Sequence, residues 1–112
     1  MNFFSNLFQK DYSDINEDKL NEIIKNNKKT LILDVRSEEE FNQGHILGAI
    51  NIPVNDLSFE LDDILSHKDN DVIIYCRSGV RSVTAAHILN DNGFTKIYNL
   101  SGGIMSYKGE LK

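Results

Sequence analysis

Short apolar runs that alternate with helical segments are the feature that most limits the folds open to this chain. Four runs have the length and composition of buried strands: Thr30–Val35, Ala49–Ile52, Asp71–Tyr75 and Lys96–Asn99. Segments with helical features lie around and between them: Glu17–Lys25, a short helix from Ser37, a helix from Asn55 or Asp56 to Leu65, Ser82–Asn92, and a short terminal helix after Gly102-Gly103. Strands that alternate with helices form parallel sheets. The sequence therefore predicts an α/β fold with a central parallel sheet and helices on both faces.

Local signals place several helix ends. Asn16 can cap the first helix, and Ser37 and Glu40 have the spacing of a capping box. Gly44 and Gly93 stand where helices can stop.

The chain of 112 residues is long enough for one compact domain and too short for two. Residues 1–14 are expected to form an N-terminal arm, and residues 15–112 to form the domain. Phe3, Phe4, Leu7 and Phe8 have helical spacing, which suits a short amphipathic turn packed on the domain or on a partner.

Charge and cysteine content exclude several classes of protein. A net charge of -5 argues against nucleic-acid or anionic-membrane binding, since both need a basic surface. A single cysteine cannot form an internal disulfide, and no apolar run is long enough for a signal peptide or a membrane span. These features predict a cytoplasmic protein without a membrane span. One segment, Val72–Asn90, holds two arginines and no Asp, Glu or Lys, so it is locally cationic.

That cationic segment contains the candidate site, Cys76-Arg77-Ser78-Gly79-Val80-Arg81, between a strand and a helix. Ligands of parallel sheets bind at the carboxyl ends of strands. The small residues allow a tight loop whose N–H groups form an anion nest, and the following helix adds its positive end. Such surroundings favour a thiolate, while the two arginines can bind an oxyanion. The pattern predicts that Cys76 is a nucleophile that acts on an anionic substrate. The alternative is that Cys76 is a buried and inert residue of the core.

Three motifs in the same order give the chain a resemblance to the rhodanese homology domain, from Ile15 to Tyr107. They are LDVRSEEEFNQGHILGAINIP at Leu33–Pro53, VIIYCRSGVRS at Val72–Ser82 and NLSGGIMSY at Asn99–Tyr107. One departure is Tyr107 where the family usually has Trp, for which we expect a packing adjustment only.

The resemblance implies a thiosulfate sulfurtransferase in which Cys76 carries sulfur as a persulfide. It also implies that the loop residues Arg77, Ser78, Gly79, Val80 and Arg81 bind the thiosulfonate group. The donor would be a small sulfur anion such as thiosulfate, and the acceptor cyanide or a thiol, either a small thiol or a thioredoxin-like protein. No cofactor is expected, and the sequence has no metal-site spacing.

Two other functions remain open. Cysteine-dependent phosphatases and arsenate reductases also use Cys and Arg in an anion loop, but the four residues between Cys76 and Arg81 are one fewer than in phosphatase loops. A persulfide carrier or interaction module that serves one dedicated partner is the other alternative, favoured by the apolar arm at Phe3–Phe8.

Several further residues have a structural interpretation. Asp34, Arg36 and Glu40 are expected to form a local ion-pair group, although Arg36 could instead face the substrate. His45 is expected to be a hydrogen-bonded structural histidine rather than an acid–base group. Gly102 and Gly103 are expected to allow close backbone packing rather than nucleotide binding.

Overall fold

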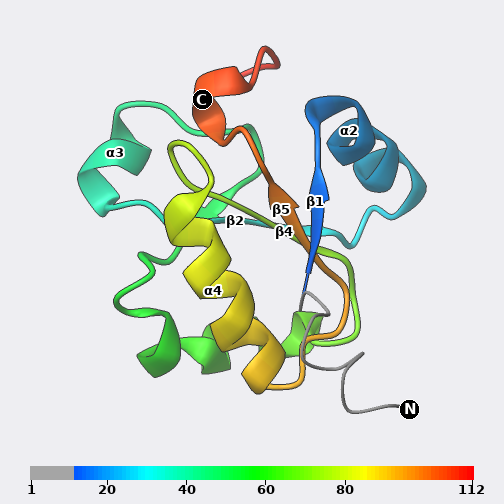
Figure 1. The fold of residues 1–112 in the computed structure, drawn as a ribbon, viewed down its shortest axis with the longest axis vertical. Helices are drawn as coiled ribbons and strands as arrows, with labels where there is room; N and C mark the ends of the chain where they lie inside the picture. The colour runs from blue at the N-terminus through cyan, green and yellow to red at the C-terminus, as the bar shows by residue number, and fades with distance from the viewer. Residues whose placement is uncertain (1–11) are drawn as a thin grey trace, which may run out of the picture.

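The computed structural model describes residues 12–112, which form an α/β fold around one five-stranded sheet (Figure 1). Its strands are β1 (Ser13–Ile15), β2 (Leu31–Asp34), β3 (Ile50–Asn51), β4 (Val72–Tyr75) and β5 (Ile97–Leu100). They are ordered β1-β5-β4-β2-β3, and every pair is parallel. All four residues of β4 are buried because this strand is the middle one and is covered on both faces.

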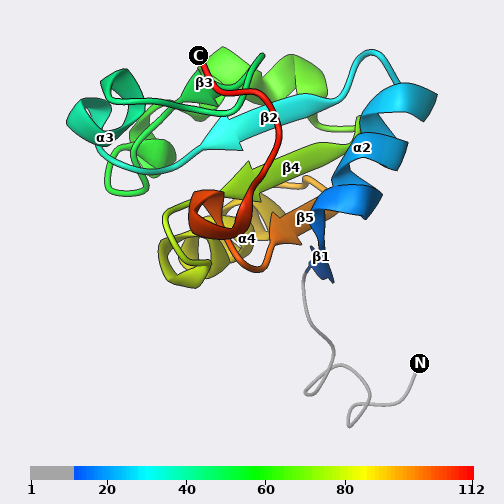
Figure 2. The ribbon, with the colours of Figure 1, turned by 90° about the horizontal axis from the view of Figure 1, so that it is seen from above.

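Helices cover both faces, as predicted (Figure 2). The α-helices are α2 (Glu17–Asn26), α3 (Glu38–Asn42) and α4 (Val80–Asp91), and short 3-10 helices occupy Leu57–Phe59, Leu61–His67 and Ile104–Ser106. One face packs on α4 and the first two 3-10 helices through residues such as Ile74, Ala85 and Leu89. The other packs on α2, where Leu20 and Ile23 contact the layer that contains Ile73.

The predicted helix caps are confirmed. The Asn16 side chain accepts a hydrogen bond from the Lys19 N–H, and Ser37 and Glu40 form both halves of the capping box. Two helical predictions need correction. Residues 57–67 form 3-10 turns rather than one helix, and α4 begins at Val80, two residues before the predicted Ser82.

The strand β1 was not predicted. Ser13 and Asp14, which the sequence assigns to the N-terminal arm, pair with Tyr98 and Asn99 of β5. Both residues are polar and exposed, so neither carries the apolar signal of a buried strand. The proposed amphipathic turn at Phe3–Phe8 lies outside the described residues.

Candidate functional site

Cys76 follows β4 directly, so the central strand places its sulfur at the carboxyl edge of the sheet, under the start of α4. The residue is only 1% exposed. The Gly79 N–H donates to the Cys76 Sγ at 3.1 Å, and the Ser82 Oγ lies 3.5 Å from the same sulfur. The sulfur therefore lies at the base of a loop that directs hydrogen-bond donors toward it.

The surroundings of Cys76 affect its ionisation in two directions. Burial raises the pKa of the thiol, because charge is disfavoured away from water. Hydrogen bonds that the thiolate can accept from the hydroxyl and backbone N–H of Ser82, and from the backbone N–H groups of Gly79 and Ser78, lower the pKa because they stabilise the charged form. The net pKa lies below that of an ordinary cysteine, which suits a nucleophile.

Gly79 is required by the path of the loop. Its φ of +103° lies in the left-handed region, and a Cβ on it would collide with the carbonyl oxygen of Ser101. This residue precedes α4 directly, so the glycine lets the loop close under the helix while its own N–H reaches the sulfur.

The segment after β5 holds the loop from the other side. The N–H groups of Ile104 and Met105 donate to the carbonyl oxygens of Cys76 and Arg77, at 3.0 and 3.1 Å. A Cβ on Gly103 would collide with the Arg77 backbone. The predicted close backbone packing is thus confirmed at Gly103, whereas Gly102 lies against the Ser106 side chain.

The two loop arginines lie in different environments. Arg81 makes a bidentate contact with the Glu40 carboxylate, at 2.7 and 2.9 Å. This contact is the main reason why the pKa of Glu40 falls from 4.5 to about 2. Arg77 is exposed, and within residues 12–112 its guanidinium has no hydrogen-bond or ion-pair partner. The structure thus leaves Arg77 available for an anion while Arg81 joins α4 to α3.

The predicted group of Asp34, Arg36 and Glu40 is only partly correct. Asp34 and Arg36 form a buried ion pair at 2.7 Å, and Arg36 also donates to the Gly44 carbonyl. Glu40 pairs with Arg81 instead, because α3 directs it toward α4. His45 has the predicted structural role: its Nδ1 lies 2.9 Å from the Phe41 carbonyl oxygen, and its ring stacks on Phe41.

An open cavity of about 490 Å³ lies beside the loop. Arg77 and Met105 line one part of it, and Arg36, Glu40 and Leu111 contribute to the rest. Its wall combines two arginines and the Glu40 carboxylate with apolar side chains, and Arg77, the residue after Cys76, is one of the two arginines. A small anion or an organic thiol would both find suitable contacts there.

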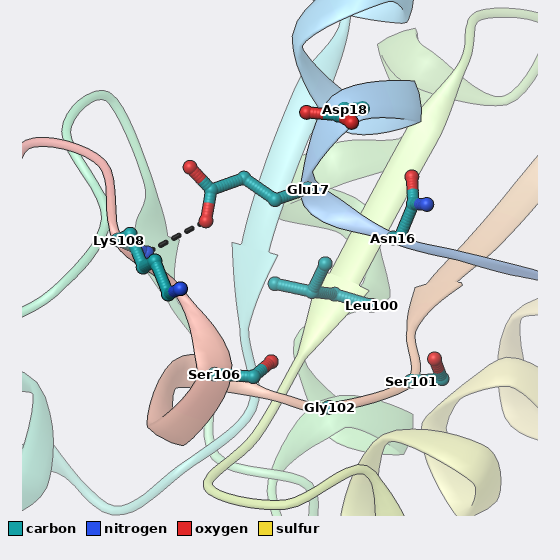
Figure 3. Close-up of a pocket in the computed structure, with 8 residues that line it drawn as sticks. All are labelled: Asn16, Glu17, Asp18, Leu100, Ser101, Gly102, Ser106 and Lys108. Carbon is teal, nitrogen blue, oxygen red and sulfur yellow. Dashed lines mark hydrogen bonds between the residues drawn. The ribbon is translucent and has the colours of Figure 1, made fainter.

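A second cavity, of about 420 Å³, lies between the start of α2 and the segment after β5 (Figure 3). Figure 3 shows the Glu17 carboxylate directed at Lys108, whose backbone N–H donates to it. This cavity has neither a cysteine nor an arginine in its wall, so the chemistry described above does not extend to it.

The part of the chain that the structure describes contains neither a candidate metal site nor a candidate membrane-spanning helix. Residues 12–112 bring together no group of three His, Cys, Asp or Glu side chains that could hold a metal ion. None of the helices in this range is both long and apolar enough to cross a membrane.

An α/β domain with a buried cysteine at the base of a loop that directs an N–H donor toward the sulfur is typical of thiol-dependent proteins. The family model of the rhodanese-like domain matches residues 16–110, and the chain belongs to this family.

Relatives with different functions share this domain. The chain is 34% identical to a sulfurtransferase of Allochromatium vinosum, over 85% of this chain and 87% of that protein. It is 39% identical to a tRNA uridine(34) hydroxylase of Buchnera aphidicola, over 72% of this chain. The chain spans only 27% of the length of that hydroxylase. It spans 66% of the length of another curated relative that it matches.

The crystal structure of a rhodanese-related protein from Thermoplasma volcanium is similar to the whole fold. The TM-score is 0.76, the sequence identity is 34%, and the match covers 90% of this chain and 98% of that one.

Proposed function

We propose that this protein is a sulfurtransferase that moves sulfane sulfur from thiosulfate, or a similar small anion, to a thiol or cyanide through a Cys76 persulfide. The observation that carries the proposal is the hydrogen bond from the Gly79 N–H to the Cys76 Sγ, 3.1 Å long, at the start of α4. A backbone donor aimed at sulfur stabilises negative charge on that atom.

In the first step the Cys76 thiolate attacks the outer sulfur of thiosulfate. A new S–S bond forms to Cys76, the bond between the two sulfurs of thiosulfate breaks, and sulfite leaves with that electron pair. Arg77 and the N–H group of Val80, which has no assigned role at the sulfur, bind the sulfonate oxygens, while the Gly79 N–H stays on the Cys76 sulfur. The persulfide anion that remains on Cys76 is stabilised by the same hydrogen-bond donors that stabilised the thiolate.

In the second step an acceptor thiolate attacks the outer sulfur of the persulfide. The S–S bond to Cys76 breaks, the acceptor leaves as its own persulfide, and Cys76 returns as a thiolate. Cyanide acts in the same way and leaves as thiocyanate. The acceptor in the cell is a small thiol or a thioredoxin-like protein.

Arg81 has a different role from Arg77 in this proposal. Its bidentate pair with Glu40 orients the guanidinium toward α3. It supports the loop and adds positive charge near Cys76, whereas Arg77 contacts the donor. This arrangement also disfavours a phosphatase, since those enzymes need the arginine of the loop on the phosphate.

A persulfide carrier that serves one dedicated partner is a second candidate. Val80 is 75% exposed and Met105 66% exposed, and both adjoin the loop. Apolar side chains around a buried sulfur favour a protein surface over a free small molecule as the acceptor.

Sulfur transfer from thiosulfate to cyanide by the purified protein tests the proposal. Cys76→Ser should keep the fold and lose essentially all thiocyanate formation, because a serine hydroxyl does not ionise in this loop. Circular dichroism checks that the variant is folded. Transfer by the serine variant above a few per cent of wild type would show that Cys76 is not the nucleophile. A wild-type protein that accepts sulfur but turns over only with a protein partner would favour the carrier.

A further inference from the structure

A line of polar side chains crosses the α4 face of the sheet, which is otherwise apolar. Asn99 of β5 is 2% exposed, and Ser82 of α4 is fully buried. Ile97, two residues before Asn99 on the same face, packs with the apolar cluster under α4. Burying an amide and a hydroxyl costs free energy unless both are hydrogen-bonded. The hydrogen-bond partners of Asn99 and Ser82 therefore indicate the role of the two side chains.

These side chains form one continuous chain of hydrogen bonds. The Asn99 Nδ2 donates to the Asp14 Oδ1 at 3.1 Å, and the two residues are also direct neighbours in the β1–β5 register. The Ser82 Oγ donates to the Asn99 Oδ1 at 2.5 Å, and the same Oγ lies 3.5 Å from the Cys76 Sγ. The chain leads from an exposed carboxylate on the edge strand to the buried sulfur.

The carboxylate at one end fixes the direction of every bond. A carboxylate only accepts, so Asn99 must turn its NH2 group toward Asp14 and its carbonyl oxygen toward Ser82. That oxygen also only accepts, so Ser82 must give it the one proton of its hydroxyl. The remaining lone pairs of Ser82 then face Cys76. Every donor and acceptor in this series of hydrogen bonds therefore has a partner when Cys76 is a thiol that donates its S–H to Ser82.

Ionisation of Cys76 reverses the last bond. The thiolate can only accept, so the Ser82 hydroxyl has to turn from Asn99 to the sulfur, which leaves the buried Asn99 oxygen without its donor. The Gly79 N–H remains on the sulfur in both states. The thiolate thus competes with Asn99 for a single proton.

We propose that Asn99, oriented by Asp14, is a positioning residue that holds the Ser82 proton away from Cys76 and so restrains ionisation of the thiol. The inference deepens the proposed function and rests on it for its consequence, since ionisation sets the pH at which sulfur transfer begins. Asn99 itself contacts no substrate.

Other charges act on Cys76 from the surrounding elements, and the test must leave them unchanged. Among the charged and titratable side chains on these elements are Arg77, Arg81, Asp34, Arg36, Glu40, Tyr75 and Asp14, and the same elements also carry His87, Asp91, Tyr98, Glu38 and Glu39. Asn99→Leu removes the competing acceptor without changing the charge of any of these groups; it also removes the hydrogen bond to Asp14, and leucine keeps the branched shape of asparagine at a larger volume.

The experiment follows the ionisation of Cys76 with pH, through the alkylation rate with iodoacetamide and the ultraviolet absorbance of the thiolate. The absorbance of Cys76→Ser is subtracted as background. Asn99→Leu should lower the midpoint by about half to one pH unit, the worth of one neutral hydrogen bond. Alkylation below the midpoint should become about three- to tenfold faster, with an unchanged plateau. An unchanged or raised midpoint would overturn the proposal.

Asp14→Asn provides an independent variant that keeps the shape of the side chain and leaves Asn99 in place. An amide at position 14 can also donate, so Asn99 is free to reverse and the midpoint should again fall. Asp18→Asn is the matched control, because it removes the same charge from an exposed side chain outside the hydrogen-bonded chain. A fall that is equal in the two variants, or that disappears in high salt, would overturn the proposal as a charge effect. Asp14→Asn decides the question if Asn99→Leu fails to fold.

The double variant Ser82→Ala/Asn99→Leu tests whether Asn99 acts through Ser82. Asn99→Leu should have no effect on the midpoint in the Ser82→Ala background, and a persisting effect would refute the proposed route. Ionisation is measured without any sulfur donor. If the variants shift the ionisation midpoint of Cys76 but the protein transfers no sulfur, the proposed function alone is wrong. If the protein transfers sulfur but the variants leave the midpoint unchanged, this inference alone is wrong.

Discussion

At the scale of single residues, the cysteine and its loop could be predicted from the sequence, but the partners of the loop side chains could not. The positions of Cys76 after a strand and of Gly79 before a helix follow from their neighbours along the chain. Glu40 and Arg81 are 41 residues apart, and their pairing depends on how α3 and α4 meet. Ser82 and Asn99 are 17 residues apart, and no spacing rule connects a helix residue to a strand residue of that kind.

The difference between the two loop arginines leads to a prediction. Arg77→Ala should lower kcat/KM for thiosulfate roughly tenfold to a hundredfold, because a charge-assisted contact to the donor is worth about 1.5–3 kcal/mol. Arg81→Ala should have a smaller effect, since its guanidinium is held by Glu40. Steady-state kinetics with thiosulfate measure both, with Lys112→Ala as the control. A larger loss in Arg81→Ala than in Arg77→Ala would reverse the assigned roles.

At the scale of elements, strands and helix caps with strong local signals were predictable, and those stabilised by tertiary contacts were not. The continuous apolar run of β4 and the capping box of α3 are local signals. β1 is a strand because β5 offers it a free edge, and its own three residues carry no strand pattern. α4 starts at Val80, directly after Gly79, which is left-handed and lies against the Ser101 carbonyl, and neither property has a signal in the local sequence.

The bond between α3 and α4 should depend on pH. The pKa of Glu40 is depressed from 4.5 to about 2, so the pair with Arg81 contributes stability above pH 4.5 that is lost as the pH falls through 2. Glu40→Gln keeps an oxygen for Ser37 but removes the charge. Both partners are partly exposed, so the loss at pH 7 should be only about 0.5–1 kcal/mol. Urea unfolding at several pH values measures it.

The difference between wild type and Glu40→Gln should shrink below about pH 4 and vanish near pH 2. Glu39→Gln, in the same helix without an ion pair among the described residues, should show no such trend. A difference that stays constant down to pH 2 would mean that the charge of Glu40 does not stabilise the fold.

The contact between the cysteine loop and Ser101 can be separated from backbone strain. Gly79 and Gly48 both have positive φ, of +103° and +87°, but only a Cβ on Gly79 meets another atom within 4 Å. Gly48→Ala should cost about 1 kcal/mol from strain alone. Gly79→Ala should cost about 1–3 kcal/mol more and slow sulfur transfer, because the loop must move away from Ser101. Thermal unfolding compares the two. Equal losses would show that the contact is unimportant.

At the scale of the whole molecule, the fold class follows from the alternation of elements, which is written in local sequence. The covering of both faces then follows from a general rule of parallel sheets, whereas the strand order β1-β5-β4-β2-β3 was not predicted. The polar chain from Asp14 to Cys76 joins four elements that are adjacent only in the folded sheet. The family was therefore accessible from sequence, and the hydrogen bonds that link Asp14, Asn99 and Ser82 to Cys76 became visible only in the structure.

The cysteine count of the whole chain determines how the proposed cycle must end. Thiol enzymes often finish with a second cysteine that attacks the first and forms a disulfide. This chain has one cysteine, so sulfur on Cys76 can leave only by attack from an outside nucleophile. Without an acceptor, thiosulfate should yield about one sulfite per chain and then stop. The stalled protein should be heavier by one sulfur atom, as mass spectrometry of the intact chain would show.

Adding an acceptor should complete the cycle. Cyanide, a dithiol or a thioredoxin-like protein should restore the original mass and restart the release of sulfite. Because the donor product leaves before the acceptor binds, varying both substrates should give the parallel lines of a double-displacement mechanism. The Cys76→Ser variant should release no sulfite and gain no mass under the same conditions. Continued release of sulfite without an acceptor, or a stalled protein of unchanged mass, would rule out a persulfide on Cys76 as the intermediate.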